Sequence, residues 1–204
     1  MLENDNNNIF LIGPMGSGKT SVGAIVAKIL AKEFHDTDQE IEAGTGVDIS
    51  YVFDVEGEMG FRQREEKLVT AITQKKNIVL ATGGGAIESK KNRRCLASNG
   101  FVVYLETSLE DQVLRAKPSG KRPLLQNVDP KKKLQELMDK RKSLYESIAD
   151  TIVKTEGHNS HSLAKQVIEN FDAHRNSKPW GQQLPYLYRR RRQFVAGEFW
   201  GLYS

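Results

Sequence analysis

The segment Gly13-Pro14-Met15-Gly16-Ser17-Gly18-Lys19-Thr20 constrains the fold of this chain more than any other part of the sequence. It matches the pattern G-x-x-x-x-G-K-[ST], in which glycines let backbone amides curl around phosphate groups without interference from side chains. The apolar run Ile9–Ile12 precedes it, and apolar residues at helical spacing follow it over residues 17–32. Strand, glycine loop and helix together predict a phosphate-binding site and disfavour the alternative, a glycine-rich turn with a chance lysine.

This loop predicts how a nucleotide would be held. Lys19 is expected to bridge the β- and γ-phosphates of ATP, and the Thr20 hydroxyl to bind Mg²⁺. The strand that ends at Ala81 carries no acid at its tip, which disfavours a motor or transport ATPase, and no Asn-Lys-x-Asp or Thr-Lys-x-Asp signature supports a GTPase. Glu106 could replace the missing acid, although a role in the first turn of the next helix is the more ordinary explanation.

The hydrophobic pattern predicts an α/β domain with a mainly parallel sheet, because short extended segments alternate with helical ones. We expect a mobile lid over residues 117–128, where Lys, Pro, Ser, Gly and Arg interrupt the apolar pattern. Besides Ile9–Ile12, the expected strands are 34–38, 78–81, 101–105 and 151–153, and the expected helices are 17–32, about 49–55, 58–75, 89–98, a short helix after Ser108, 130–148 and 163–171.

Composition excludes several classes of protein. The chain of 204 residues and 23.0 kDa fits one domain with an appendage. No stretch approaches the ~18 consecutive apolar residues of a membrane span, and the first residues lack the pattern of a secretory signal. The single cysteine, Cys95, permits neither an internal disulfide nor a cysteine metal cage, so a reducing cytoplasm is the expected location.

The positive charge of the chain is concentrated near its C-terminus. The formal charge is +4, and residues 175–204 hold six basic residues and one acidic residue, so residues 1–174 are close to neutral. We therefore expect a domain at 1–174 and an atypical basic and aromatic extension at 175–204, and a near-neutral domain argues against a nucleic-acid partner. The run Arg189–Arg192 among aromatic residues leaves three alternatives open: RNA or anionic-surface binding, partner docking, and no selected role.

Two acids follow the second expected strand. Alternate strand residues face the same way, so Asp36 and Asp38 are expected on one side of this strand, open to the γ-phosphate. Two carboxylates so close to a polyphosphate need Mg²⁺ or arginines to offset their repulsion. We therefore expect Asp36 to act on the metal ion through water and Asp38 on a substrate hydroxyl, the alternative being that both acids cap the next helix.

Arginines and glycines in three further segments complete the candidate site. Arg62 and Glu65 share one helical face, and Arg141 lies on the long helix over residues 130–148. Taken alone, each arginine would be an ordinary solvated residue. Gly83-Gly84-Gly85 leaves bare backbone N–H donors at the carboxyl end of a strand, where open parallel sheets usually bind ligands.

These segments occur in an order that resembles the shikimate kinase family over about residues 8–174. The resemblance implies ATP-dependent phosphorylation of the 3-hydroxyl of shikimate, a step in aromatic amino-acid biosynthesis, by a P-loop kinase with a five-stranded parallel sheet of order 2-3-1-4-5. The matching segments are Gly13–Thr20, Asp36-Thr37-Asp38, Phe61-Arg62 with Glu65, Gly83-Gly84-Gly85, Arg122-Pro123-Leu124-Leu125, and Arg141 with Tyr145.

The resemblance also implies roles for single residues. It assigns Asp38 to the ring hydroxyls and Arg62 and Arg141 to the shikimate carboxylate, with Gly84 and Gly85 donating from the backbone beside Gly83. Arg122 in the lid would act on the transferring phosphate, and Arg115 would lie beside adenine. The family also suggests a monomer and an adenine pocket near residues 158–160.

Two other classes of function remain open. A different small-molecule kinase on the same scaffold, such as a gluconate kinase, would use the same nucleotide loop with another acceptor. A non-catalytic nucleotide sensor or RNA-associated ATPase is favoured only by the C-terminal extension, and it would not require Asp38, Arg62 or Arg141. The four histidines show no metal-ligand spacing.

Overall fold

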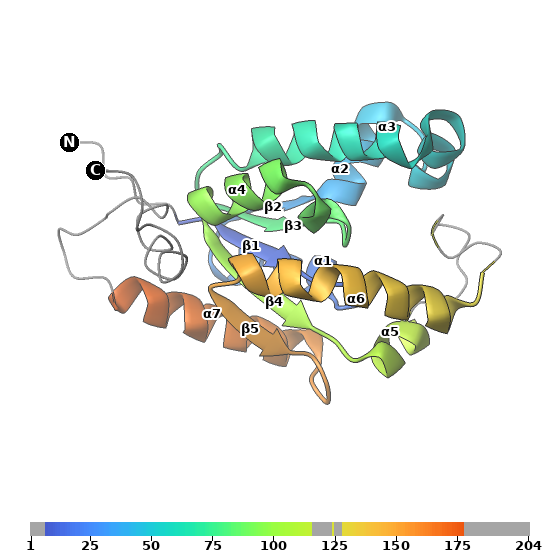
Figure 1. The fold of residues 1–204 in the computed structure, drawn as a ribbon. Coiled ribbons are helices and arrows are strands. Elements are labelled where there is room, and N and C mark those ends of the chain that lie inside the picture. The colour runs from blue at the N-terminus through green and yellow to red at the C-terminus, as the bar shows by residue number, and fades with distance from the viewer. Residues whose placement is uncertain (1–6, 116–123, 125–127, 178–204) are drawn as a thin grey trace, which may run out of the picture.

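The computed structural model describes residues 7–115, 124 and 128–177. Its strands form one sheet between two layers of helices (Figure 1). The elements are β1 (Ile9–Ile12), α1 (Lys19–Ile29), β2 (Glu33–Asp36), α2 (Thr37–Thr45), α3 (Ile49–Ile72), β3 (Ile78–Ala81), the 3₁₀ turn η1 (Ala86–Glu88), α4 (Lys90–Asn99), β4 (Phe101–Glu106), α5 (Leu109–Arg115), α6 (Pro130–Ile148), β5 (Thr151–Lys154) and α7 (Ser160–Asn176).

The five strands are parallel and follow the order β2-β3-β1-β4-β5, which confirms the predicted topology. β1 lies at the centre, where Phe10 pairs with Leu80 of β3 and with Val102 of β4. Every residue of β1 is buried, as expected for a parallel strand that is covered by helices on both faces. The loop that follows β1 therefore begins at the middle of the carboxyl edge of the sheet.

Alternate residues of β1 face two separate cores, because successive side chains of a strand point to opposite faces. Ile9 and Leu11 pack with apolar residues of α1 and α7. Phe10 and Ile12 pack with apolar residues of α3, α4 and α6, which lie on the other side of the sheet (Figure 1). Full burial of one such side chain contributes about 1.5–3 kcal/mol, so the two cores hold β1 and the start of its loop firmly in place.

The expected strand over residues 34–38 is wrong at its end. β2 stops at Asp36, and Thr37 and Asp38 belong to the first turn of α2. The reason is the side chain of Asp36, which accepts hydrogen bonds from the backbone amides of Asp38 at 3.0 Å and Gln39 at 3.3 Å and so caps the helix. Asp36 and Asp38 consequently do not alternate along one strand.

The two helices expected over 49–55 and 58–75 form one element with a break. Gly57 has φ 69° and ψ 176°, a conformation that other residues rarely adopt, and it separates the two helical parts of α3. The second part ends at Ile72. The break lies one turn before Arg62, so it sets the direction from which the second half of α3 enters the site.

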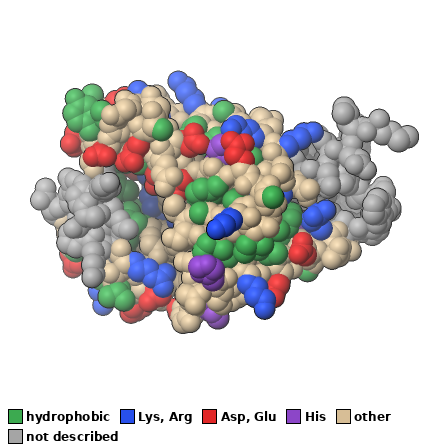
Figure 2. Space-filling model, turned by 180° about the vertical axis from the view of Figure 1, so that it is seen from behind, with side chains coloured by type: hydrophobic (Ala, Val, Ile, Leu, Met, Phe, Trp, Pro, Cys, Tyr) green, Lys and Arg blue, Asp and Glu red, His purple; other side chains and the backbone are tan. Residues whose placement is uncertain are grey.

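The surface carries both signs of charge. On the face seen in Figure 2, lysine and arginine side chains are interspersed with acidic ones over the described residues. None of the helices in the described ranges is long and apolar enough to cross a membrane.

Candidate active site

The loop between β1 and α1 has the backbone conformation that its glycines allow. Gly13, Gly16 and Gly18 have positive φ values of 146°, 78° and 86°. A Cβ atom on Gly13 would lie 2.6 Å from the carbonyl oxygen of Leu105, so this position admits no side chain. The loop then leads directly into the N-terminus of α1, where free amides and the helix dipole favour a phosphate group.

Lys19 is buried inside this loop. Its Nζ donates hydrogen bonds to the carbonyl oxygens of Gly13 at 2.9 Å and Pro14 at 2.7 Å, and to Ser17 Oγ at 3.2 Å. The ammonium group is therefore held at the centre of the glycine loop, the position from which it could reach the phosphates of a nucleotide.

Thr20 and Asp36 meet beside the loop. Thr20 Oγ1 donates to Asp36 Oδ2 at 2.7 Å, while Asp36 Oδ1 caps α2. From the sequence, capping of the next helix and a role at the metal ion were alternatives for Asp36. The structure shows that one oxygen of its carboxylate caps α2 while the other accepts from the Thr20 hydroxyl. A hydroxyl and a carboxylate oxygen at the end of a P-loop are ligands that suit Mg²⁺.

Asp38 lies in the first turn of α2, and its carboxyl group interacts with Lys19 of the phosphate loop and with Arg62 of α3. Close packing of protein atoms around the carboxyl group, with Asp36 and Glu65 nearby, raises its pKa from 3.8 to about 6, although Lys19 and Arg62 oppose the shift. A carboxylate that is poised close to neutral pH in a site is typical of groups that accept or guide protons.

The glycine triplet after β3 fits between the predicted functional residues. A Cβ atom on Gly83 would lie 2.5 Å from Glu65 Oε1 and 2.8 Å from Asp38 Oδ1, and one on Gly85 would overlap the guanidinium of Arg62. One expectation about this turn is wrong: the amide of Gly83 is not bare, because it donates to Thr37 Oγ1 at 2.6 Å. Thr37 is the first residue of α2, at a position where the sequence predicted a strand.

Arg62 is tied into the site by two acids. Its Nη1 donates to Glu65 Oε2 at 2.7 Å, and its Nη2 donates to Glu58 Oε1 at 3.2 Å. Glu65 is 1% exposed, and burial raises its pKa, although Arg62 and Arg141 favour its charged form. Glu65 Oε1 has no hydrogen-bond partner among the described residues. The pair is thus part of a buried network and differs from the solvated ion pair that its spacing alone would suggest.

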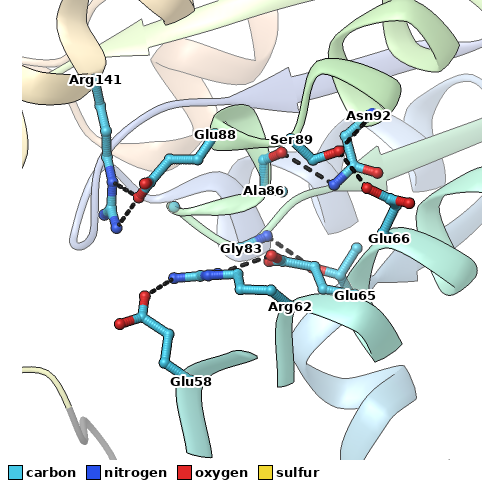
Figure 3. A network of polar contacts seen from close by, with 12 residues as sticks. Glu58, Arg62, Glu65, Glu66, Gly83, Ala86, Glu88, Ser89, Asn92 and Arg141 are labelled. Carbon is cyan, nitrogen blue, oxygen red and sulfur yellow. Dashed lines mark hydrogen bonds and ion pairs between the residues drawn. The ribbon is translucent and has the colours of Figure 1, made fainter. Parts of the chain in front are cut away.

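Arg141 reaches the same network from α6. It is 4% exposed, its Nε donates to Glu88 Oε1 at 2.8 Å, and its Nη2 forms an ion pair with the same oxygen at 2.6 Å. Figure 3 shows the guanidinium groups of Arg62 and Arg141 on the same side of the glycine turn, although the two residues come from different helices. The structure therefore brings together the two arginines that the sequence separates widely.

Sequence reasoning missed two residues of this network, Glu58 and Glu88. Glu58 follows the break at Gly57, and Glu88 ends the 3₁₀ turn after the glycine triplet. Glu58 lies four residues before Arg62 on the same helix, a spacing that could have indicated the pair. The contact of Glu88 with Arg141 follows no such pattern, because it depends on how separate elements pack. Tyr145 was found only through the family resemblance, and its hydroxyl donates to the Gly84 carbonyl oxygen.

Arg115 lies over the phosphate loop from α5. Its Nη1 donates to the carbonyl oxygen of Gly16 at 3.2 Å, and its Nη2 pairs with Asp111 at 3.0 Å. The predicted lid residue Arg122 lies outside the described residues, as does most of the predicted lid over 117–128. Glu106 pairs with Lys142 at 3.7 Å at the end of β4, outside the helix in whose first turn it was expected.

Sequence comparison finds close relatives. The family described as Shikimate kinase matches residues 15–172 of this chain. The shikimate kinase of Shewanella amazonensis is 52% identical over 165 residues, which are 81% of this chain and 96% of that protein. The shikimate kinase of Histophilus somni is 52% identical over 169 residues, which are 82% and 97% of the two chains.

Comparison with solved structures agrees with the match to the shikimate kinase family. A shikimate kinase from Acinetobacter baumannii, in complex with shikimate, superposes with a TM-score of 0.80 at 43% identity and covers 84% of this chain and 95% of its own. A gluconokinase from Sinorhizobium meliloti has a TM-score of 0.52 at 14% identity, covering 84% and 97% of the two chains, which shows a common fold alone.

Proposed function

The chain belongs to the shikimate kinase family, whose members phosphorylate shikimate with ATP in the shikimate pathway, and from this premise we propose how its own residues perform the reaction. The acceptor is the 3-hydroxyl group of shikimate. The observation that carries the proposal is the position of Arg62 and Arg141, which lie on the same side of the glycine turn with Asp38 and the phosphate loop next to it.

Arg62 and Arg141 bind the carboxylate of shikimate. A guanidinium group offers several N–H donors in one plane, and a carboxylate can accept two of them at once. In the structure Arg62 pairs with Glu65 and Arg141 pairs with Glu88, so each guanidinium group has an acidic partner. Gly83, Gly84 and Gly85 form the wall of this subsite, where a side chain on Gly83 would take the space of Glu65 and one on Gly85 the space of Arg62.

Asp38 accepts a hydrogen bond from the reacting hydroxyl group and guides its proton. The transition state of phosphoryl transfer is loose, so rate enhancement comes mainly from alignment of the hydroxyl with the γ-phosphorus and from neutralisation of charge. Lys19 supplies positive charge at the phosphates. With a pKa of about 6, Asp38 is largely ionised at neutral pH and available as an acceptor.

Mg²⁺ is the metal ion that suits this site, with the Thr20 hydroxyl as one ligand and Asp36 acting through water. An ion held there would supply positive charge that offsets the charge of the phosphates. The contact between Thr20 Oγ1 and Asp36 Oδ2 supports this assignment, because it already joins the two groups beside the phosphate loop.

Arg115 and Arg122 complete the proposed nucleotide contacts. Arg115 is placed beside adenine because it lies over the loop at Gly16. Arg122 is assigned to the transferring phosphate through the sequence resemblance alone. The protein is proposed to act in the cytoplasm, which agrees with its single cysteine, and as a monomer, which rests on the family resemblance.

Release of ADP in the presence and absence of shikimate tests the function. We expect rapid release with Mg²⁺, ATP and shikimate, and only slow release without shikimate or with gluconate in its place. The variant Lys19→Met serves as a control for contaminating ATPases. Equal ADP release with and without shikimate would contradict the proposal, and faster release with gluconate would favour the alternative acceptor.

A further inference from the structure

The guanidinium group of Arg141 has an internal carboxylate partner. Glu88 Oε1 accepts a hydrogen bond from Nε of Arg141 and forms an ion pair with its Nη2, and the other carboxylate oxygen of Glu88 pairs with Nζ of Lys140. Some burial raises the pKa of Glu88, but the hydrogen bonds from Lys140 and Arg141 outweigh it and hold the pKa below its ordinary value. At neutral pH, Glu88 therefore carries a full negative charge. It lies beside Arg141, the residue that we assign to the negatively charged carboxylate of shikimate.

The contact uses one edge of the guanidinium group. Nε and Nη2 form the side edge, and Glu88 occupies it with a single oxygen atom. Nη1 has no hydrogen bond or ion pair with Glu88 among the described contacts. Together with the second N–H of Nη2 it forms the end edge of the guanidinium, which could still receive a carboxylate in a bidentate way. Shikimate would then share Arg141 with Glu88, and the two carboxylates would repel each other across one cation.

Resting on the proposed function, we propose that Glu88 is an internal competitor for Arg141, which stabilises the empty site and lowers the affinity of the enzyme for the carboxylate of shikimate. Arg141 is 4% exposed, and a buried guanidinium without a partner is strongly destabilising. Glu88 supplies this partner in the free enzyme. The affinity for shikimate is lowered, because the substrate carboxylate binds an arginine whose charge Glu88 already partly neutralises.

The proposal differs from two simpler roles. If Glu88 only stabilised the fold, its removal would change the thermal stability and leave shikimate affinity unchanged. If Glu88 only oriented Arg141, its removal would weaken shikimate binding. Competition alone predicts that removing the charge lowers stability and strengthens binding at the same time, because the substrate then replaces the missing partner.

The variant Glu88→Gln tests the competition, because it keeps an acceptor oxygen of the same reach and removes the charge. Glu66→Gln is a matched control: Glu66 accepts from Ser89 Oγ at 2.6 Å and pairs with Lys91, and it has no hydrogen bond or ion pair with either arginine (Figure 3). The measurements are the Kd of shikimate by calorimetry, the KM, and the Tm with and without shikimate.

We expect Glu88→Gln to tighten shikimate binding by about three- to tenfold, the size of one partly exposed charge interaction. Its Tm without shikimate should fall, and the increase of Tm on adding shikimate should be larger than in the wild type. Shikimate methyl ester, which has no negative charge, should gain nothing from the substitution. Glu66→Gln should bind shikimate like the wild type.

A second variant keeps the test decisive if Glu88→Gln folds poorly. Lys140→Met removes the other partner of Glu88 and leaves its charge on Arg141 alone, so shikimate should bind more weakly. Unchanged or weaker binding by a folded Glu88→Gln, or unchanged or tighter binding by Lys140→Met, would overturn the proposal. A wild-type enzyme without shikimate-dependent ADP release would instead overturn the proposed function itself.

Discussion

Tyr145 donates a hydrogen bond of 2.5 Å from its phenol group to the carbonyl oxygen of Gly84, 61 positions earlier in the chain. The contact joins α6, which carries Arg141, to the glycine turn at the edge of the sheet. Tyr145 is 1% exposed and stacks on Tyr104 with 5.0 Å between ring centroids. Two parts of the proposed shikimate site are therefore held together by one buried hydroxyl group.

Replacement of this hydroxyl should loosen the glycine turn. We expect Tyr145→Phe to lower the free energy of unfolding by about 1–2 kcal/mol, because a buried carbonyl group loses its partner. The KM for shikimate should rise severalfold while the KM for ATP stays the same, since the nucleotide loop does not depend on this bond. Chemical denaturation and steady-state kinetics measure the two effects.

Tyr104→Phe is the matched control for this prediction. The Tyr104 hydroxyl is buried without a hydrogen-bond partner among the described residues, and burial raises its pKa to about 12. Its removal should leave the stability unchanged or slightly increased. A Tyr145→Phe enzyme as stable and as active as Tyr104→Phe would show that the bond to Gly84 has no role.

Gly85 leaves the space that Arg62 needs. A Cβ atom at this position would overlap Nη1, Nη2 and Cζ of Arg62, so Gly85→Ala must push the guanidinium away from its place in the network. We expect the KM for shikimate to rise by at least about tenfold, a loss of about 1.4 kcal/mol of binding energy, with little change in the KM for ATP.

Gly44→Ala provides a comparison, because a Cβ atom there meets nothing within 4 Å and the residue lies in helix α2. This substitution should be neutral for both KM values and slightly stabilising, since alanine favours a helix by about 0.5–1 kcal/mol over glycine. If Gly85→Ala also left shikimate binding unchanged, Arg62 would not need its present position.

The pH dependence of the enzyme should report the ionisation of Asp38. Its pKa is raised to about 6 by close packing and by Asp36 and Glu65, so the fraction of ionised Asp38 falls as the pH drops below this value. We expect kcat/KM for shikimate to decrease with an apparent pKa of about 6 and to fall about tenfold per pH unit below it. Circular dichroism over the same range would show that the protein stays folded.

The raised pKa of Asp38 affects stability in the opposite direction from activity. An acid whose pKa is higher in the folded chain than its ordinary value of 3.8 is more easily ionised in the unfolded chain, so stability falls as the pH rises from about 4 through 6. Asp38→Asn should therefore raise the Tm at pH 7.5 slightly while turnover is lost. A kcat/KM that remains constant down to pH 4.5 would contradict this account of Asp38.

Local patterns in the sequence predicted the fold class and the phosphate loop, whereas the strand order was implied by the family resemblance. The alternation of strands and helices determined the fold class, and the spacing from Gly13 to Thr20 determined the loop. The end of β2 was predicted wrongly, because a short polar segment can extend a strand or cap a helix, and the choice depends on which amides Asp36 meets in space.

The candidate site was only partly predictable for a similar reason. Arg62 and Arg141 look like surface residues in the sequence, and their burial results from the packing of α3 and α6 against the glycine turn. The family resemblance identified them where spacing could not. Glu88 escaped both approaches, because its contacts with Arg141 and Lys140 follow from a 3₁₀ turn that no motif describes.

The central claim is that Arg62 and Arg141 bind one carboxylate beside the phosphate loop. The most direct measurement compares the affinity of Arg62→Lys for shikimate and for ATP by calorimetry. Lysine keeps the charge but loses the bidentate contact, so shikimate binding should weaken by about 1–3 kcal/mol while ATP binding changes little. An equal loss of both affinities, or no loss of shikimate affinity, would contradict the account.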